Sequence, residues 1–372
     1  MAEPMRVLQI MGPMGRGGAE NMIMELYRHM DRSVIQFDFV EHNTDRGSYD
    51  DEIEALGGRI FRVPRYRGSN HFAYKRVWKR FFREHPEYKI IHCHIRSTAS
   101  IICKIARKFG VKSIAHSHNT SNGGGISAYA KKFFQGSLAS SADYLFGCSR
   151  EAGLWLFGEK AIKGSNYRFF PNATNVDDFL FNAADRASVR SELGVDEDTV
   201  VYVNVARYHP QKNHLFLVEA FAAIHEKQKN SVLVLVGDGE LRKDVEAHIQ
   251  KLGIEEYVRV LGVRRDIPRL MNGMDAFLLP SKWEGLPVTM VEAQANGLPC
   301  LISDTVTRDV NITPLIHYIP IDKGFEPWVS VALTADLKRE DHQDAIRAAG
   351  FDIHSSVCTL RDFYRNIHPD SP

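Results

Sequence analysis

The sequence has few cysteines and no feature of a secreted or membrane-spanning chain. Its five cysteines are odd in number and widely spaced, without a CxxC or Cys/His metal pattern, so we expect no disulfide framework and a reducing compartment. The opening MAEPMRVLQIM lacks the charged region and apolar core of a signal peptide. No stretch approaches the roughly 18 apolar residues of a membrane-spanning helix. These absences predict a cytoplasmic protein, which still allows peripheral binding to the inner face of the plasma membrane.

Net charge is also low, at +1 over 372 residues. The total conceals an asymmetry, because residues 1–170 carry 26 basic and 16 acidic side chains, whereas residues 171–372 carry 21 and 30. The balances are therefore +10 and −9. The ordinary contents of 44% hydrophobic and 25% charged residues exclude disordered and fibrous classes. A basic half within a neutral chain predicts that this half meets an anionic partner or surface.

Apolar runs alternate with amphipathic stretches along the whole chain, which predicts an α/β fold with parallel sheets. The length indicates two domains, and turn formers cluster in YRFFPNATNVDD at 167–178. We expect Rossmann-like domains at 1–170 and 171–345, and a C-terminal segment at 346–372 that packs back on the first domain. The stretch Asp341–Ile367 is expected to be helical. The expected strands are Arg6–Met11, Phe37–Val40, Arg59–Val63, Ile90–His94, Lys112–His116, Tyr144–Cys148, Thr199–Val205, Ser231–Val236, Val258–Leu261, Ala276–Leu279 and Pro299–Ser303.

The most informative stretch is LPSKWEGLPVTMVEAQAN at 279–296. A strand ends at Leu279, and Pro287 suits the first position of a new helix. Free N–H groups around that helix start favour a phosphate. Glu284 precedes the helix and Glu292 lies in its second turn, where carboxylates accept hydrogen bonds from sugar hydroxyls. The stretch predicts a ligand with both phosphate and vicinal diols; the alternative is a pair of solvated surface acids.

A second cluster follows the expected strand Thr199–Val205. Arg207 and Lys212 bracket a tight loop at the carboxyl end of that strand. Two fixed cations there would neutralise a diphosphate and stabilise the charge on a departing one. The alternative is a solvated loop with routine charges.

Two glycine-containing turns follow other expected strands. The first, GPMGRGGAE at 12–20, does not match GxGxxG spacing, and either brings backbone close to a phosphate or acceptor or is a simple strand-to-helix turn. The second, Gly237-Asp238-Gly239, follows VLVLV. It is expected to be structural, although Gly237 would permit close approach of a base or ribose.

Histidines end two neighbouring strands, in IHCH at 91–94 and AHSHN at 115–119. HxH is a common zinc pattern, but the spacing offers no third ligand, so no metal is expected. A histidine at a carboxyl strand end is better placed for hydrogen bonding or proton transfer.

The positive charge is concentrated in residues 62–89, which carry nine basic and two acidic side chains. Aromatic and aliphatic side chains interleave with the cations at helical spacing. They are Tyr74, Val77, Trp78, Phe81 and Phe82. Either this face meets anionic lipid headgroups, or the aromatic residues are core and the cations are solvated. Nucleic-acid binding is not expected, because no recognised motif supports it.

Taken together, these motifs make the chain resemble the retaining glycosyltransferases of family 4, particularly enzymes of bacterial capsular and exopolysaccharide biosynthesis. The resemblance covers nearly the whole chain and implies the GT-B fold, in which two Rossmann-like domains face each other across a cleft. The matching segments are GGAE at 17–20, the two histidine motifs, PNxxxxDxF at 171–179, ARxxxxKN at 206–213, VGDGE at 236–240, LGxxxDI at 261–267, PSxxEGLPxxxxEAQAxGLP at 280–299 and SDTVTRDV at 303–310.

The resemblance assigns roles to particular residues. Residues matching Arg207 and Lys212 hold the donor diphosphate, and the one matching Glu292 binds the nucleotide ribose. Glu284 and the backbone of Gly285, Leu286 and Pro287 contact donor sugar and phosphate, while Gly17 and Gly18 approach from the N-terminal domain. His116 is expected near the reacting carbon, with His118 as the alternative. PNATNVD at 171–177 replaces the usual PNG-type turn, a departure expected to affect the hinge more than the chemistry.

The implied reaction transfers a hexose from a nucleotide sugar, here a UDP-sugar, to a saccharide or lipid-linked acceptor with retention and without a metal or other cofactor. Two rivals remain. A nucleotide-sugar epimerase or a phosphorylase shares the architecture but does not explain the 280–299 stretch, and no cofactor-binding lysine is identifiable for a phosphorylase. A non-catalytic nucleotide-sugar-binding assembly subunit is disfavoured by the intact Arg207, Lys212, Glu284 and Glu292.

Overall fold

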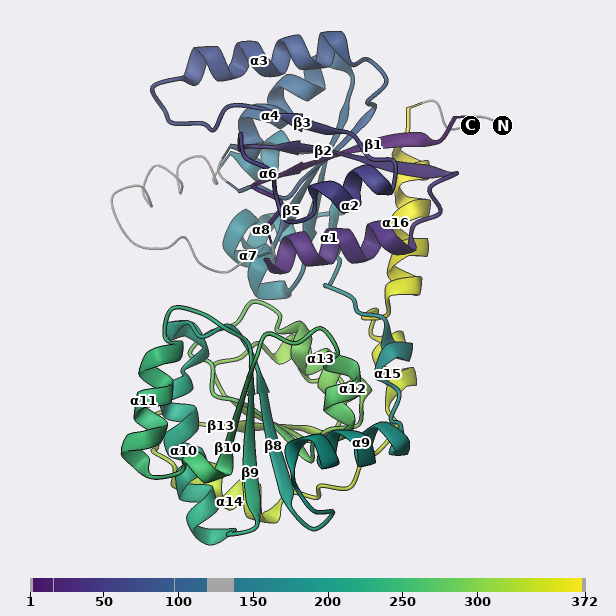
Figure 1. Cartoon of the computed structure of the whole chain (residues 1–372). Coiled ribbons are helices and arrows are strands. Elements are labelled where there is room, and N and C mark those ends of the chain that lie inside the picture. Colours follow the sequence, from purple (N-terminus) through teal and green to yellow (C-terminus); the bar gives the residue numbers. More distant parts are fainter. Residues whose placement is uncertain (1–2, 16, 97, 119–136, 370–372) are drawn as a thin grey trace. The chain divides into compact units, whose positions relative to one another are not determined.

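The computed structural model describes residues 3–15, 17–96, 98–118 and 137–369. Arg16 of the GPMGRGGAE motif and Asn119 of the AHSHN motif lie outside these ranges. The chain divides into two compact units: Met1–Ala173 together with Ile353–Pro372 form the first unit, and Thr174–Asp352 form the second unit. Each unit contains one parallel sheet with helices on its faces (Figure 1).

The first unit is built on a seven-stranded parallel sheet in the order β3-β2-β1-β4-β5-β6-β7. All six strands expected in this half are confirmed, and β7 lies in the turn-rich segment around residue 167. The strands are β1 Met5–Met11, β2 Ile35–Glu41, β3 Ile60–Arg62, β4 Ile90–Cys93, β5 Lys112–Ser117, β6 Tyr144–Gly147 and β7 Tyr167–Phe169. The helices are α1 Gly18–His29, α2 Asp50–Ala55, α3 His71–Glu84, α4 Ala99–Ala106, α6 Leu138–Ser141, α7 Arg150–Phe157, α8 Glu159–Ile162 and α16 Ile353–Ile367.

The second unit has a six-stranded parallel sheet in the order β10-β9-β8-β11-β12-β13. Its strands are β8 Val200–Val205, β9 Ser231–Val236, β10 Val258–Gly262, β11 Ala276–Leu279, β12 Cys300–Ser303 and β13 Ile316–Ile319. Its helices are α9 Ala183–Leu193, α10 His214–Lys227, α11 Arg242–Leu252, α12 Ile267–Asn272, α13 Val288–Ala295, α14 Glu326–Thr334 and α15 Gln343–Ala348. Five of these strands were expected from the sequence, and β13 was not.

The strand order of each sheet creates one topological switch point. In the first unit β1 pairs with both β2 and β4, and in the second unit β8 pairs with both β9 and β11. Ligands of open α/β sheets bind outside the carboxyl ends of the strands at such points. The loops after β8 and β11 are the two segments that carry the phosphate and sugar motifs, so the topology brings these motifs to one edge of the second sheet.

The helix expected over residues 341–367 is two helices instead. α15 ends at Ala348 and Gly350 adopts a left-handed conformation, with φ +84°, before α16 begins at Ile353. α16 belongs to the first unit, where Ile353, Leu360 and Tyr364 are buried in the same core cluster as the apolar face of α1. The break at Gly350 therefore separates a helix of the second unit from a helix of the first.

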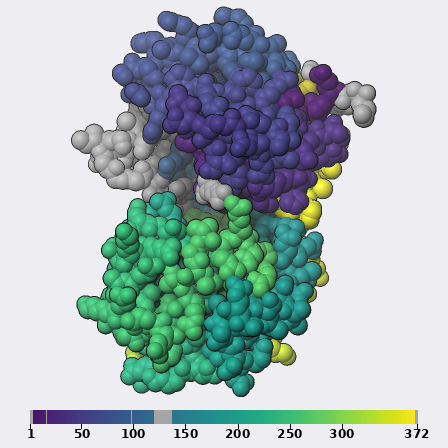
Figure 2. All heavy atoms as spheres, viewed as in Figure 1, coloured from purple at the N-terminus to yellow at the C-terminus, as the bar shows by residue number. Residues whose placement is uncertain are grey.

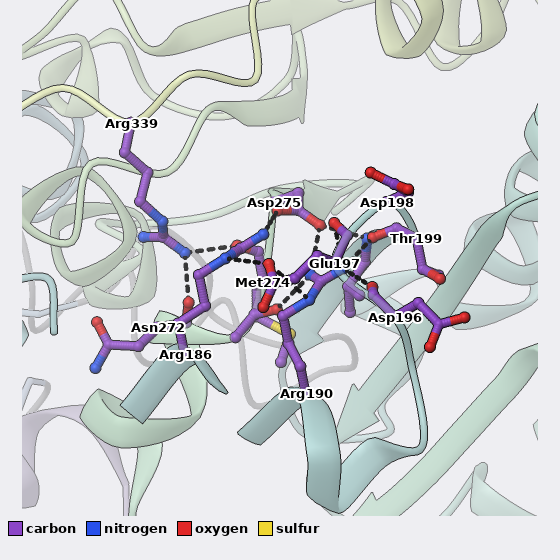
Figure 3. A network of polar contacts seen from close by, with 12 residues as sticks. Arg186, Arg190, Asp196, Glu197, Asp198, Thr199, Asn272, Met274, Asp275 and Arg339 are labelled. Atoms are coloured by element: carbon purple, nitrogen blue, oxygen red, sulfur yellow. Dashed lines mark hydrogen bonds and ion pairs between the residues drawn. The ribbon is translucent and has the colours of Figure 1, made fainter. Parts of the chain in front are cut away.

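A buried arginine holds the start of the second unit's sheet together (Figure 3). Arg190 on α9 is 1% exposed. It donates to the Asp275 carboxylate (3.0 Å) and to the backbone carbonyls of residues 197 (3.0 Å) and 273 (3.2 Å). Asp275 also accepts from Arg186 (2.9 Å) and from the backbone N–H of Val201 (2.8 Å). The network joins α9 to the beginnings of β8 and β11.

The aromatic stripe expected in residues 62–89 lies on α3 and is part of the core. Tyr74, Trp78, Phe81 and Phe82 are all buried against the first sheet, because their spacing places them on one helix face. The idea that this stripe itself contacts a membrane is therefore wrong. The exposed aromatic side chain at this helix is Phe72, which is 80% exposed, and the α3 segment (blue) forms part of the first unit's surface (Figure 2).

Candidate active site

The loop after β8 carries the two cations expected at a diphosphate. Arg207 is exposed and makes no ion pair with the residues that the structure describes. The chain then forms the short 3-10 turn Pro210–Lys212, capped by the His209 ring, which accepts from the Gln211 N–H at 3.2 Å. Asn213, with φ +60°, ends this turn and begins α10. The left-handed residue makes the reversal from turn to helix tight, which fixes where the Lys212 side chain leaves the backbone.

The loops after β8 and β11 are joined by an ion pair. Lys212 Nζ donates to Glu284 Oε1 at 2.6 Å, and the two side chains are only 21% and 6% exposed. Gln211 Nε2 donates to Glu284 Oε2 at 3.1 Å and to the carbonyl of Trp283 at 2.8 Å. The Lys282 N–H donates to the Gln211 carbonyl at 2.8 Å. The structure thus brings Lys212 and Glu284 together, although they are far apart in the sequence.

The start of α13 presents unused backbone donors. Pro287 is its N-cap residue and supplies no side-chain cap. The N–H groups of Gly285 and Leu286 donate to no acceptor among the described residues. Such free donors, with the positive end of the helix dipole, favour an anion. Glu292 lies in the second turn of the same helix, as expected, and is partly exposed.

Gly237 is required by packing inside the second unit. Its φ is +135°, and a Cβ atom there would lie 2.1 Å from the Ala206 carbonyl oxygen. The turn after β9 therefore presses directly against the loop after β8. The Tyr208 N–H donates to the Asp238 carbonyl (3.1 Å) and the Tyr208 carbonyl accepts from Leu241 (3.2 Å). This turn supports the loop that carries Arg207.

The glycines of the first unit follow β1 at the other switch point. Gly17 caps α1 with φ −91°, and Gly18 is its first residue. Neither needs a left-handed backbone, and a Cβ at Gly18 would meet nothing within 4 Å. A Cβ at Gly17, by contrast, would clash with the Glu20 carboxylate, so the backbone is open at Gly18 and covered by Glu20 at Gly17. Glu20, two residues on, has its pKa raised by burial.

Four histidines gather at the carboxyl ends of β4 and β5, and we call His92, His94, His116 and His118 the histidine cluster. The two-residue spacing of each pair puts both rings on one face of its strand, and the parallel register sets His92 opposite Ile114. Ring centroids are 4.4 Å apart for His92 and His94, 5.2 Å for His92 and His116, and 4.0 Å for His116 and His118.

Burial governs the charge of this cluster. Desolvation lowers the pKa of His92, His94 and His116 well below the usual value, and that of His118 to about 3. All four rings are therefore neutral near pH 7. His116 and His118, the two alternatives for the residue near the reacting carbon, are thus expected to act as uncharged hydrogen-bonding groups.

The structure also corrects the expectation that HxH lacks a third partner. One ring nitrogen from each of His92, His94 and His116 lies within 4.8 Å of the other two. The spacing of 22 residues between His94 and His116 gave no sign of this, because the contact depends on the pairing of β4 with β5.

Sequence reasoning missed three polar residues that position the expected ones. Gln211 holds the second oxygen of Glu284. Gln9 Oε1 accepts from His94 Nε2 at 3.0 Å, and the Tyr364 hydroxyl lies 2.6 Å from His92 Nδ1. The alternation of β1, which places Gln9 on the same side as its neighbours' histidines, was the only available signal for Gln9. Tyr364 had none.

Family profiles cover most of both units. Residues 16–178 match the family described as Glycosyltransferase Family 4, and residues 185–312 match the family described as Glycosyl transferases group 1. The chain is also 35% identical over 368 residues, 96% of each chain, to a protein of Bacillus subtilis (strain 168) named as the glycosyltransferase EpsF. The chain is a family 4 glycosyltransferase. The resemblance drawn from the motifs is thereby confirmed.

A second relative is more distant and only partly covered. The UDP-Gal:alpha-D-GlcNAc-diphosphoundecaprenol alpha-1,3-galactosyltransferase of Escherichia coli is 30% identical over 229 residues, 59% of this chain and 58% of that enzyme. Among solved structures, Anabaena HepE in complex with UDP superposes with a TM-score of 0.77 at 16% identity, covering 98% of this chain and 100% of HepE. The two Rossmann-like sheets of this glycosyltransferase are therefore those of the GT-B fold.

Proposed function

We propose that this glycosyltransferase retains anomeric configuration while it transfers a hexose from a UDP-sugar to a saccharide or lipid-linked acceptor in cell-surface polysaccharide biosynthesis. The observation that carries the proposal is the pairing of Lys212 with Glu284 beside the free N–H groups at the start of α13. A cation, an anion-binding helix start and a carboxylate that can accept hydrogen bonds from sugar hydroxyls then lie together at the switch point of the second sheet.

In this proposal the diphosphate is held without a metal ion. Arg207 and Lys212 neutralise it and stabilise the negative charge on the departing UDP, and the backbone of Gly285, Leu286 and Pro287 adds the helix dipole. Lys212 exchanges part of its bond to Glu284 for a phosphate oxygen. Glu284 is thereby released to accept from a donor-sugar hydroxyl.

The remaining assignments follow the resemblance. Glu292 accepts from the ribose hydroxyls, and Gly237 lets the nucleoside approach the loop after β9. Gly17 and Gly18 approach a phosphate or the acceptor, with the open backbone at Gly18 and the Glu20 carboxylate beside Gly17. His116, or His118 beside it, acts near the reacting carbon as a neutral imidazole that takes part in a hydrogen bond.

The choice of UDP and of a lipid-linked acceptor rests on relatives. HepE is crystallised with UDP, and the Escherichia coli enzyme is named for UDP-Gal and a diphosphoundecaprenol acceptor. No helix among the described residues is long and apolar enough to cross a bilayer. We propose that the chain works in the cytoplasm, where the cations around α3 and the exposed Phe72 hold the first unit on the anionic inner face of the plasma membrane.

A donor panel tests the function. The chain is incubated with UDP-, GDP- and ADP-sugars and diphosphoundecaprenol-linked acceptors, and product is followed by mass spectrometry. We expect a UDP-sugar to give product with its anomeric configuration retained, and Glu284→Ala and Lys212→Ala to abolish it. Formation of an epimerised nucleotide sugar without transfer would establish the epimerase instead. Binding of UDP-sugars by a folded chain that neither transfers nor hydrolyses them would establish a non-catalytic subunit.

Liposome flotation tests the membrane part separately. We expect the chain to float with anionic but not zwitterionic vesicles, and Phe72→Ala to weaken this. Leu154→Ala, at another exposed apolar residue of the first unit, is the control. Equal flotation with both vesicle types would refute this part and leave the transferase proposal intact.

A further inference from the structure

The histidine cluster has more ring nitrogens than hydrogen-bond partners. Nε2 of His92 is buried and bonds to nothing in the described part of the chain, and the two buried nitrogens of His116 have at most the backbone of Phe170 as a partner there. A buried polar atom without a partner is costly and calls for an explanation. We propose that His92, His94 and His116 bind one divalent transition-metal ion of the Zn²⁺ class.

The outer nitrogens of two of these rings are already held by oxygen atoms. His92 Nδ1 lies 2.6 Å from the Tyr364 hydroxyl, and His94 Nε2 lies 3.0 Å from Gln9 Oε1. Metal-binding histidines almost always donate their second ring N–H to an oxygen in this way, which fixes the ring and its tautomer. This arrangement leaves Nε2 of His92 and Nδ1 of His94 as the ligand atoms.

The nitrogens are close enough to share one ion after the rings turn inward. One nitrogen of each ring lies within 4.8 Å of the other two, whereas two nitrogens at about 2.0–2.1 Å from a tetrahedral Zn²⁺ lie about 3.4 Å apart. A pair at the 4.8 Å limit would therefore close by about 1.4 Å through rotation of the side chains. His94 Nδ1 now accepts from His118 Nε2 at 2.8 Å, and the metal replaces that bond.

The donor set selects the class of ion. Neutral imidazoles suit Zn²⁺, Co²⁺, Ni²⁺ and Cu²⁺, whereas Mg²⁺ and Ca²⁺ require oxygen ligands. His118, partly exposed and adjacent to His116, or a water molecule completes four-coordination.

The metal in this site is an inhibitor and not a cofactor. This consequence rests on the proposed role of His116 in transfer, because a metal ion occupies the nitrogen that would otherwise face the substrate. The diphosphate is held by cations of the second unit and does not need the ion. Transfer is therefore expected to survive chelation and to fall when Zn²⁺ is added.

Metal binding is measured without any sugar donor, so its outcome is independent of the transferase proposal. The full chain is stripped with a chelator, dialysed and titrated with Zn²⁺ by calorimetry and with Co²⁺ by visible absorption. We expect one tight equivalent per chain and the intense d–d bands of four-coordinate Co²⁺. Mg²⁺ is expected to give no heat.

Three variants locate the ion. His116→Asn is expected to abolish the tight equivalent. Tyr364→Phe, which removes only the oxygen beside His92, is expected to weaken affinity 10- to 100-fold, and it keeps the test valid if His116→Asn misfolds. The control is the double variant His29→Gln/His354→Gln, which removes a partly exposed histidine pair of the same unit with ring centroids 5.2 Å apart. It is expected to bind as the unmodified chain does.

Three results would overturn the site: no saturable binding of Zn²⁺ or Co²⁺, unchanged binding by both His116→Asn and Tyr364→Phe, or loss of binding in the His29/His354 control. Zn²⁺ inhibition of transfer with a midpoint far from the calorimetric dissociation constant would refute the inhibitory role alone.

Discussion

The ion pair between Lys212 and Glu284 gives the sharpest prediction. Replacing Lys212 with Met keeps much of the apolar stem and removes the ammonium. A hydrogen bond to a charged group contributes about 1.5–3 kcal/mol, and 1.4 kcal/mol is tenfold in affinity, so loss of a phosphate contact would raise the Kd for UDP roughly 10- to 150-fold. Lys212 already has Glu284 as a partner at 2.6 Å. UDP binding therefore replaces one partner of Lys212 with another, and we expect the Kd for UDP to rise by about tenfold, the lower end of this range.

Calorimetric titration with UDP measures this, and Lys282→Met is the matched control. Lys282 lies on the loop after β11 but is exposed, so its removal makes the same change in net charge without touching the pair. At physiological salt, we expect its effect to be under about twofold. A Kd for Lys212→Met within twofold of the unmodified chain, or equal to that of Lys282→Met, would refute the placement of the diphosphate at Lys212.

Stability in the absence of nucleotide provides a second measure of the same pair. Lys212→Met leaves the Glu284 carboxylate, which is 6% exposed, with Gln211 as its remaining side-chain partner. We expect a loss of about 2 kcal/mol in unfolding of the second unit. In the double variant Lys212→Met/Glu284→Gln the losses should sum to less than the two single losses, by about 1–2 kcal/mol. Strict additivity would mean that the pair contributes nothing.

Three other perturbations test the frame of the two units. Arg190→Met leaves several buried backbone carbonyls without a donor and Asp275 with Arg186 and the Val201 N–H as partners, and it should cost about 3–5 kcal/mol in urea unfolding. Arg347→Met, at a surface ion pair, should cost less than about 1 kcal/mol, and equal losses would contradict the network. Gly237→Ala places a methyl group against the Ala206 carbonyl and should lower the free energy of unfolding by about 3 kcal/mol or more. The control is Gly194→Ala, where φ is +67° but a Cβ meets open space, and it should lower the free energy of unfolding by about 1–2 kcal/mol. The histidine cluster is neutral when folded and protonates when unfolded, so its stabilisation is present above the unfolded pKa of about 6.5 and is lost as pH falls below it. Four such rings lower the free energy of unfolding by at most about 5 kcal/mol per pH unit. Burial raises the pKa of Glu41 to about 7, which offsets about 1.4 kcal/mol of this loss between pH 6 and 5. Urea midpoints of the metal-stripped chain that do not fall over this range would refute the neutral cluster.

Most of the fold follows from local apolar pattern. Buried parallel strands are short runs of apolar residues between turns, so eleven of the thirteen strands that the structure describes could be predicted from the sequence. β13, Ile316–Ile319, escaped because His317 and Tyr318 interrupt its apolar character. The single helix expected over residues 341–367 is broken because Gly350 takes a left-handed backbone. The spacing of apolar residues does not reveal the backbone conformation of a single glycine.

The candidate site was predictable to the extent that it depends on loops after strands. The proximity of Lys212 and Glu284 follows once the strand order places β8 beside β11. The supports of the histidine cluster do not follow, because Gln9 and Tyr364 are 355 residues apart. The sequence predicted that the C-terminal helix packs on the first domain, but not which side chains it meets there.

The return of α16 to the first unit makes the second unit an insertion within the first. Residues 174–352 have both of their ends joined to one domain, so during synthesis the second unit has all of its residues before the first unit receives its last helix. The first unit therefore completes its core only after every residue of the second unit has been synthesised. A premature stop between Asp352 and Tyr364 would release a chain with a complete second unit and an unfinished first one, in which Gln9 and His92 lack a common partner.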